Sequence, residues 1–455
     1  MATEITEQRQ ALEGAVAPTF FRYLLTSMTG LIAMTSASLV DGVFIGNYVG
    51  VTALAAVNLI IPIMALSFGV AIMVGVGGSV RGGKYLGEND IIAASSIFSK
   101  TLSFMVLYGF VAVGSALIFE KKLFAFLGAG EELFPVMSDY YRIVTPFLFA
   151  QFITIVLYFF VRLDDMPSLA AFSLGLGALV NIFLDYLFIA QYGWGLKGAA
   201  LATGLSELCS MVVLLSYFFR SDRTLQFKLW QNNWFEVLQA AYNGISEFIN
   251  EVSGGIITFI FNWMLIQRAG VSGVAAITVV NYALMVGFMV FWGISDTIQV
   301  MVSQNFGAQN ANRINEFLKT AVLTISLLSM AAILILLSSS ESIILLFIDG
   351  TEDQKTVFLA TQFVFYVWPL FIFAGFNMLI SGYLTAIHRP FQSGLVAVSR
   401  SLVLPAGFLI LLYAVMNDFR FVIALPVAEG LTFALAAVIF LKHMPADVVI
   451  QSSKE

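Results

Sequence analysis

Long runs of apolar and small residues, interrupted only by short polar turns, make up most of this chain. One membrane-spanning helix needs roughly 20 mainly apolar residues, and most of the runs are longer than that. Only 11% of the 455 residues are charged, whereas a soluble domain carries about 25%. The sequence therefore predicts an integral membrane protein. A β-barrel is disfavoured, because the runs are much longer than barrel strands and lack alternation.

The apolar runs predict twelve membrane-spanning helices. We expect them near Phe20–Ile45, Ala53–Ser79, Ala93–Phe119, Ser138–Arg162, Ser168–Ala190, Gly198–Phe219, Val237–Gln267, Val274–Ser303, Asn315–Ser340, Thr356–Thr385, Phe391–Val415 and Phe421–Leu441. With the amino terminus inside, 15 of the 22 Lys and Arg residues fall in inner segments and 7 in outer segments. Because cytoplasmic loops are enriched in basic residues, we expect both termini in the cytoplasm.

An internal repeat divides the chain into halves. Residues 50–57 (GVTALAAV) match residues 270–277 (GVSGVAAI), and residues 84–90 (KYLGEND) match residues 304–310 (QNFGAQN), both at an offset of 220. Pro146 pairs with Pro369 and Pro167 with Pro390, both at an offset of 223. The longest polar connection, residues 220–233, lies between the halves. We therefore expect an amino-terminal bundle at residues 1–219, a cytoplasmic linker at 220–235 and a carboxyl-terminal bundle at 236–455.

The number of helices in each half decides how the halves are related. Six is an even number, so both halves enter the membrane from the same side. The expected fold is an all-α membrane protein with two six-helix bundles, related by a pseudo-twofold axis along the membrane normal. In folds of this kind the substrate site lies between the repeats near the midplane. This architecture favours a transporter over a receptor or a membrane enzyme.

Composition excludes several other classes. The net charge of −6 argues against nucleic acid as a partner, because no basic patch is present to meet a phosphate backbone. Cys209 is the only cysteine and the two histidines are far apart, so neither an intrachain disulfide nor a Cys/His metal cluster is expected. No HExxH, GxSxG or phosphate-loop motif occurs. We therefore expect neither an enzyme nor a resident cofactor, and a channel is disfavoured because no repeated filter element is present.

Asp41 is the only charged residue between Tyr23 and Val80. A carboxylate in the middle of a membrane costs about 2.5–3.5 kcal/mol on insertion scales, so such residues usually have a function. The alternative is that Asp41 lies near a helix end, or hydrogen-bonds to a neighbouring helix and only stabilises the fold.

Several motifs in register resemble the multidrug and toxic compound extrusion (MATE) family, over nearly the whole chain. They are DGVFIG at residue 41, the GVxALAAV turn at residue 50, GxxYLGEND at residue 82, GISEFINE at residue 244 and SQNFGAQN at residue 303. The resemblance implies two six-helix bundles around a central cavity, and exchange of sodium ions or protons for cationic, amphipathic drugs. It also implies a cation site at Asp41, Asn181, Asp185 and Thr203, with Asp41 and Asp185 as the metal ligands if sodium is the coupling ion.

The chemistry of these four residues supports the same site. Asn181 and Asp185 are four residues apart, which puts them on one helical face. Carboxylate, amide and hydroxyl oxygens suit a hard cation, and two carboxylates in a dry site repel, so we expect one of them to hold a proton near neutral pH. The alternative is a hydrogen-bonded polar core that only packs the helices. The family's amide on the fourth helix has no evident counterpart, and either Tyr158 or Gln151 is a candidate replacement.

Polar residues elsewhere are candidates for the substrate cavity. Glu207 lies four residues after Thr203, and Glu247, Glu251, Asp296 and Glu429 lie in the second half. Another branch of the family uses acids on helices seven and ten, but here helix ten offers Asn377 and Ser381 and no acid, which argues against a complete second ion site. The expected cavity residues are Glu207, Glu251, Asp296, Tyr158, Gln151 and Asn377. The alternative for the acids of helices seven and eight is solvation near the inner surface or a capping role.

These observations together predict a secondary multidrug antiporter of a prokaryotic inner membrane. We expect organic cations as substrates, membrane lipids as surroundings and a monomeric state. The alternative is a lipid-linked oligosaccharide flippase of the same superfamily. Flippases usually have additional spans and cationic cavities, whereas the intramembrane charges here are acidic.

Overall fold

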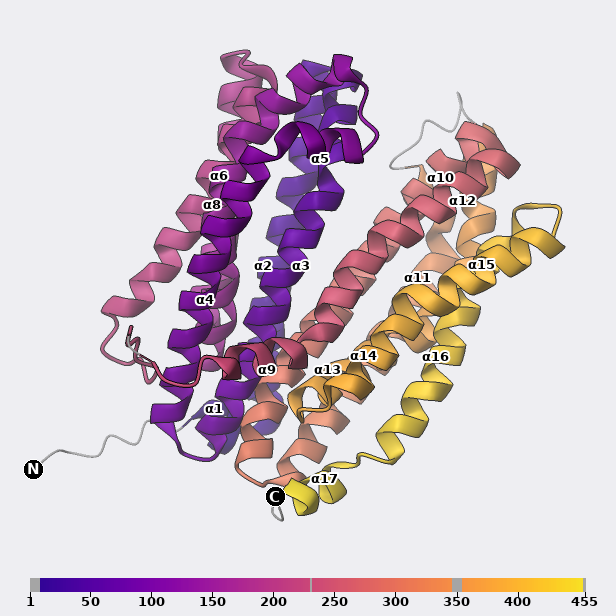
Figure 1. The fold of residues 1–455 in the computed structure, drawn as a ribbon. Coiled ribbons are helices and arrows are strands. Elements are labelled where there is room, and N and C mark those ends of the chain that lie inside the picture. Colours follow the sequence, from indigo (N-terminus) through magenta and orange to yellow (C-terminus); the bar gives the residue numbers. More distant parts are fainter. Residues whose placement is uncertain (1–8, 230, 346–353, 453–455) are drawn as a thin grey trace, which may run out of the picture. The chain divides into compact units, whose positions relative to one another are not determined.

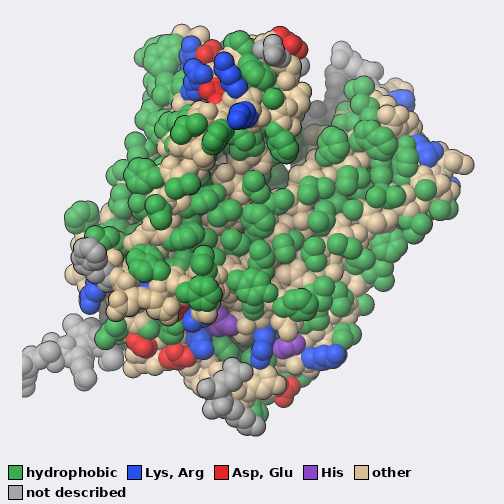
Figure 2. All heavy atoms as spheres, viewed as in Figure 1, with side chains coloured by type: hydrophobic (Ala, Val, Ile, Leu, Met, Phe, Trp, Pro, Cys, Tyr) green, Lys and Arg blue, Asp and Glu red, His purple; other side chains and the backbone are tan. Residues whose placement is uncertain are grey.

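The computed structural model describes residues 9–229, 231–345 and 354–452, and these are almost entirely helical (Figure 1). Residues 1 and 455, the outer ends of the two expected bundles, lie outside this range. The chain separates into two compact units, Met1–Gly244 and Ile245–Glu455. On the face drawn in Figure 2, apolar side chains cover the middle of each unit, and charged side chains gather toward its ends. Such a surface is suited to a lipid bilayer.

The first unit contains six long helical stretches and several short helices. They are α1 (Gln10–Glu13), α2 (Val16–Phe44) continued by the π-helical segment η1 (Ile45–Val49), α3 (Val51–Gly87), α4 (Ile91–Ile118), α5 (Glu120–Phe126), η2 (Glu131–Leu133), α6 (Phe134–Leu163), α7 (Pro167–Asp185) continued by the π-helical segment η3 (Tyr186–Gln191), α8 (Gly195–Leu215) with η4 (Ser216–Phe219), and α9 (Phe235–Asn243).

The second unit has a comparable set. It consists of α10 (Ile245–Gly307), α11 (Ala311–Ile344), α12 (Gln354–Val367), α13 (Leu370–Ala386), α14 (Pro390–Val398), the π-helical segment η5 (Ser399–Val403), α15 (Leu404–Val415), η6 (Phe419–Ile423), α16 (Ala424–Leu441) and α17 (Pro445–Ser452).

Among the described residues, ten helices are long and apolar enough to cross a membrane, or eleven when the bent pair α12 and α13 is counted as one span. One of them, α10, has 63 residues. At 1.5 Å per residue it would be about 95 Å long if straight, about three times the thickness of a bilayer core. It is broken at Gly270, where φ is 68° and ψ is −162°, so α10 supplies two spans. The expectation of twelve helices in two bundles is therefore confirmed.

The break in α10 is the counterpart of the hairpin between the first two spans. Gly50, which separates η1 from α3, has φ 111°, and Gly270 has φ 68°. A side chain at a positive φ is strained, and glycine is the residue that adopts it readily. Gly50 and Gly270 begin the two matched segments of the internal repeat, so the repeat in sequence marks a repeated turn in the backbone.

Two further pairs of turns repeat in the same way. Asn89 and Gln309, 220 residues apart, have φ of 62° and 57°. Each precedes a helix cap: the side chain of Asp90 accepts a hydrogen bond from the backbone NH of Ala93, and Asn310 does the same for Arg313. Asp165 and His388, 223 residues apart, have φ of 59° and 58°. The two units therefore share helix boundaries even where their side chains differ.

Two of the expected helices differ from the observed ones. The single helix expected at Thr356–Thr385 is the pair α12 and α13, bent by 54°. The break precedes Pro369, which has no NH and whose ring clashes with the preceding turn. The helix expected to start at Val237 starts at Ile245, because Gly244 ends the short helix α9. Helix α9 packs on α3 and α4.

The polar connection before α9 is attached to the first unit. The backbone NH of Gln226 donates to Ser95 Oγ at 3.0 Å, and that of Lys228 donates to Ser99 Oγ at 2.9 Å. These serines are four residues apart on one face of α4. The extended connection therefore runs along this face of the helix. The segment is therefore held by hydrogen bonds of its backbone.

A buried ion pair fixes α9. The Nζ atom of Lys100 on α4 lies 2.7 Å from Oε2 of Glu236 on α9, and the two residues are 4% and 7% exposed. Arg81 Nε lies 3.1 Å from Oε1 of the same carboxylate, and the Tyr85 hydroxyl also donates to it. Burial alone would raise the pKa of Glu236, but the hydrogen bonds from Lys100, Tyr85 and Arg81 outweigh burial and hold this pKa below its ordinary value.

Replacing Glu236 with Gln is expected to destabilise the first unit by about 3–5 kcal/mol, because it leaves the ammonium of Lys100 buried without a counter-charge. Thermal unfolding of the purified protein measures this. Glu88→Gln is the matched control, since the Lys84–Glu88 pair is substantially exposed and is worth less than about 1 kcal/mol. Equal losses in both variants would contradict the assignment.

The same ion pair predicts a dependence on pH. The stability that Glu236 contributes is fully present above the pKa of an unfolded glutamate and is lost as the pH falls through the lowered folded value. The melting temperature of the wild type is therefore expected to fall more steeply with acidification than that of Glu236→Gln. Parallel curves for the two proteins would show that this carboxylate is not engaged as described.

Candidate functional site

The four expected cation ligands come from three helices that pack together in the first unit. Asp41 lies near the end of α2, Asn181 and Asp185 lie in the last turns of α7, and Thr203 lies on α8. Helix α7 contacts both α2 and α8. Asp41 and Asp185 are close enough to interact electrostatically.

Several buried oxygens of this site have no hydrogen-bond partner. Asp185 is 0% exposed and Asn181 is 6% exposed, whereas Asp41 and Thr203 are half-buried. Within the described part of the chain, Oδ1 of Asp41, both carboxylate oxygens of Asp185 and Oγ1 of Thr203 have no hydrogen-bond partner. Buried polar groups in native proteins are nearly always hydrogen-bonded. These oxygens are therefore unusual, and they occur together.

The backbone beside both acids is also irregular. The π-helical segment η1 begins four residues after Asp41, and η3 begins immediately after Asp185. The two segments contact each other, and each contacts α8. Short π-helical segments within helices are frequent at functional sites. Here η1 follows the end of α2 that carries Asp41, and η3 follows the end of α7 that carries Asp185.

Tyr140 of α6 is a member of this site that the sequence did not reveal. It is 5% exposed and interacts with Thr203, Asp41 and Asp185. A tyrosine in an apolar run carries no signal that distinguishes it from a packing residue. Its phenolic hydroxyl adds a donor and an acceptor to the group.

The donor set determines what this site is able to hold. In the described residues no group of three or more His, Cys, Asp or Glu side chains is arranged for a metal ion, so a transition-metal centre is not indicated. Two carboxylates with amide and hydroxyl oxygens offer only hard ligands, which suit a proton or a small hard cation. Either one would relieve the repulsion between Asp41 and Asp185.

The other expected residues of the first unit have partners of their own. The amide of Gln151 on α6 donates to Oε1 of Glu207 on α8 at 3.4 Å. Tyr158, also on α6, lies beneath the guanidinium of Arg162, whose Cζ is 5.1 Å from the ring centroid. Gln151 and Tyr158 are thus each engaged with a different charged side chain.

The second unit holds a separate polar cluster. Asn377 of α13 is 0% exposed and donates to Oε2 of Glu429 on α16 at 2.6 Å. Glu247 of α10 accepts from the amide of Gln299 at 2.8 Å and interacts with Asp296. Glu251 and Asp296 are both half-buried on α10. The structure thus brings Asn377 together with Glu429, and Asp296 together with Glu247.

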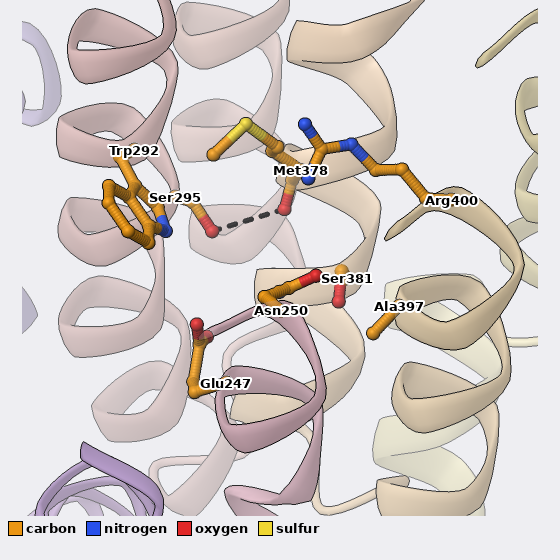
Figure 3. Close-up of a pocket in the computed structure, with 8 residues that line it drawn as sticks. All are labelled: Glu247, Asn250, Trp292, Ser295, Met378, Ser381, Ala397 and Arg400. Carbon is orange, nitrogen blue, oxygen red and sulfur yellow. Dashed lines mark hydrogen bonds between the residues drawn. The ribbon is translucent and has the colours of Figure 1, made fainter. Parts of the chain in front are cut away.

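A small pocket lies in this second cluster (Figure 3). It is lined by Glu247, Asn250, Trp292, Ser295, Met378, Ser381, Ala397 and Arg400. Arg400 lies within the span Pro390–Val415, and its side chain is 13% exposed. In the sequence, an intramembrane role of Arg400 is indicated by its position as a single arginine inside an apolar run.

Comparisons with known proteins agree with this architecture. The MatE family model matches residues 27–187 and 249–411. The multidrug export protein MepA of Staphylococcus haemolyticus is 23% identical over 404 residues, covering 88% of each chain. The solved structure of an outward-facing multidrug resistance MATE family transporter is 22% identical, with a TM-score of 0.88 over 97% of this chain and 98% of that chain. A MOP superfamily transporter from Pyrococcus furiosus gives the same identity, coverage and TM-score.

Two six-span bundles with intramembrane carboxylates define a multi-pass membrane transporter. The chain belongs to the MatE family, whose model covers matched parts of both bundles.

The unpartnered carboxylates predict a distinctive effect on stability. Asp185→Asn is expected to raise the melting temperature by a few degrees in sodium-free buffer at pH 8, because it removes a buried charge that repels Asp41. Adding Na⁺ or lowering the pH to 6 is expected to stabilise the wild type but not the variant. A ligand at a hundred times its dissociation constant stabilises by about 2.7 kcal/mol.

Asp139→Asn is the control for Asp185→Asn, since Asp139 is exposed at the surface and its side chain lies beside that of Lys197. A variant Asp185→Asn that melts below the wild type in sodium-free buffer would show that the carboxylate is a structural partner. It would not then be a site for an exchangeable cation.

Proposed function

We propose that this chain is a secondary multidrug antiporter that exports cationic, amphipathic small molecules in exchange for H⁺ or Na⁺. The observation that carries the proposal is the pair Asp41 and Asp185: in the described chain, Oδ1 of Asp41 and both carboxylate oxygens of Asp185 are buried without hydrogen-bond partners. The names of curated relatives add support, since MepA is a multidrug export protein. Those relatives do not favour the flippase alternative.

The proposed coupling site consists of Asp41, Asn181, Asp185 and Thr203, with Tyr140 beside them. An ionised carboxylate in an apolar bundle is costly, so binding of a cation at this place is favourable. A proton would neutralise one carboxylate and convert it to a hydrogen-bond donor. Na⁺ would instead bind to several of the oxygens at once. In this proposal the cation is the transported counter-substrate and is released after each cycle.

The proposed attraction of the drug comes from acids that are partly accessible. Glu207, Glu251 and Asp296 are half-buried, so each is able to face a cationic substrate within its own bundle. Gln151, Asn377 and Tyr158 support this lining by holding charged neighbours in place. The soft methionine and aromatic side chains that are abundant in the chain suit substrates of varied shape.

The proposed coupling is competition between the two ligands. In the outward-facing state, cation binding at Asp41 and Asp185 bends α2 and displaces the drug, so the two are never carried together. The irregular segment η1 gives α2 a place at which its end is able to move. Both termini are proposed to be cytoplasmic and the protein a monomer of the inner membrane, in accord with the bias of Lys and Arg.

Asp41→Asn is expected to reduce efflux of a fluorescent organic cation to the background of empty vesicles, while the protein still inserts and purifies as a folded species. The assay uses proteoliposomes under a sodium gradient and, separately, under a pH gradient. The gradient that drives wild-type efflux identifies the coupling ion. Asp139→Asn, a surface variant, is expected to transport at the wild-type rate. Undiminished efflux by Asp41→Asn would remove this site from the mechanism.

A further inference from the structure

A buried ion pair in the second unit contrasts with the unpartnered acids of the first. Glu429 of α16 is 6% exposed, and its Oε1 lies 2.9 Å from Nε of Arg400. Its Oε2 accepts from Asn377 Nδ2 at 2.6 Å, and the same amide donates to the backbone carbonyl of Glu429 at 2.9 Å. Oε1 of this carboxylate therefore lies in an ion pair with Arg400, and Oε2 accepts a hydrogen bond from Asn377.

The backbone explains why an arginine reaches this position. Arg400 lies in the π-helical segment η5, directly before α15, which has Pro405 at its start. Proline cannot donate to the turn before it and clashes with that turn, so the helix widens there. The guanidinium packs over the ring of Phe288, with Cζ 5.7 Å from the centroid. It also lines the pocket of Figure 3 and interacts with Glu247.

The first unit has no equivalent of this guanidinium. Arg400 comes ten residues after Pro390, and the residue ten after Pro167 is Gly177. A Cβ atom on Gly177 would lie 2.0 Å from Ser210 Oγ, so a side chain there would require Ser210 to move. Glu207, 222 residues before Glu429, also meets an amide, that of Gln151. The amide–carboxylate pair is repeated in both units, whereas the position of Arg400 is a glycine in the first unit.

We propose that Arg400 is a tethered counter-ion that occupies, at Glu429, the role that an exchangeable cation has at Asp41 and Asp185. Glu429 then does not exchange Na⁺ or protons during transport, and the coupling ions are bound by the first unit. This inference rests on the proposed function, because it compares Arg400 with the transported cation. The side chain of Arg400 alone would thus limit the chain to one coupling site.

The arrangement predicts what happens at Glu429 when Arg400 is replaced by an uncharged residue. Without the guanidinium, Glu429 would retain only the amide of Asn377 beside a pocket that Glu247 also lines. Asp296, which interacts with Glu247, adds further negative charge nearby. A small cation or a proton is the natural replacement in such surroundings. Arg400→Met, which keeps an unbranched side chain and removes the charge, should therefore create an exchangeable site at Glu429.

Infrared difference spectroscopy of the reconstituted protein tests this inference, because carboxylate and carboxylic acid bands respond to both protons and Na⁺. Spectra are recorded on replacing choline with Na⁺ at pH 8, and on moving between pH 9 and pH 6. The background is Asp41→Asn/Asp185→Asn, which removes the signals of the first unit. Adding Arg400→Met is expected to produce a new band equivalent to one carboxyl group per chain, which Glu429→Gln abolishes. Arg400→Lys keeps the charge and should show no such band.

Two outcomes would overturn the inference. One is a band that depends on Glu429 while Arg400 is present, and the other is the absence of any such band in folded Arg400→Met protein. If Arg400→Met does not fold, Glu429→Gln in the otherwise wild-type protein decides the matter. Its cation-driven spectrum should equal that of the wild type, and loss of a band would contradict the inference. Failure of the proposed function would appear separately, as wild-type spectra without any band that depends on Asp41 or Asp185.

Discussion

Two carboxylates that the protein does not satisfy, Asp41 and Asp185, are the constraint on which this structure depends. In the described residues, Oδ1 of Asp41 and both carboxylate oxygens of Asp185 are buried without hydrogen-bond partners, and each carboxylate is costly when ionised. A fold that needed only stability would have paired them, as it pairs Glu236 with Lys100 and Glu429 with Arg400. The pairs hold helices in place, whereas Asp41 and Asp185 form the coupling site that we propose for a cation.

The two halves share a backbone plan and differ in chemistry. Positive φ angles recur at Gly50 and Gly270, at Asn89 and Gln309, and at Asp165 and His388, so the turns of the ancestral unit persist. The polar residues have diverged between the units. The first unit joins acids to irregular helix ends at η1 and η3, whereas the second places an arginine in η5. The two bundles thus share a scaffold and differ in their charges, and we propose that only the first binds the coupling cation.

The sequence predicted the fold well, because apolar length and the in-register repeat report directly on spans and turns. It did not predict that Pro369 breaks a helix while Pro146 lies within the continuous α6, since the same residue is tolerated or not according to its packing. It proposed Asp41, Asn181, Asp185 and Thr203 from spacing and resemblance. The part of Tyr140 in the site and the pairing of Arg400 with Glu429 could be found only from the structure, because these contacts join residues far apart in the chain.

The most direct measurement is carbon-13 NMR of the carboxyl groups in aspartate-labelled protein, with Asp41 and Asp185 assigned by single Asn variants. The two resonances are predicted to shift together on titration between pH 9 and pH 6, or on addition of Na⁺ at constant pH, and to shift back when an organic cation substrate is added. Two carboxylates that stay ionised and unresponsive under all of these conditions would contradict the account.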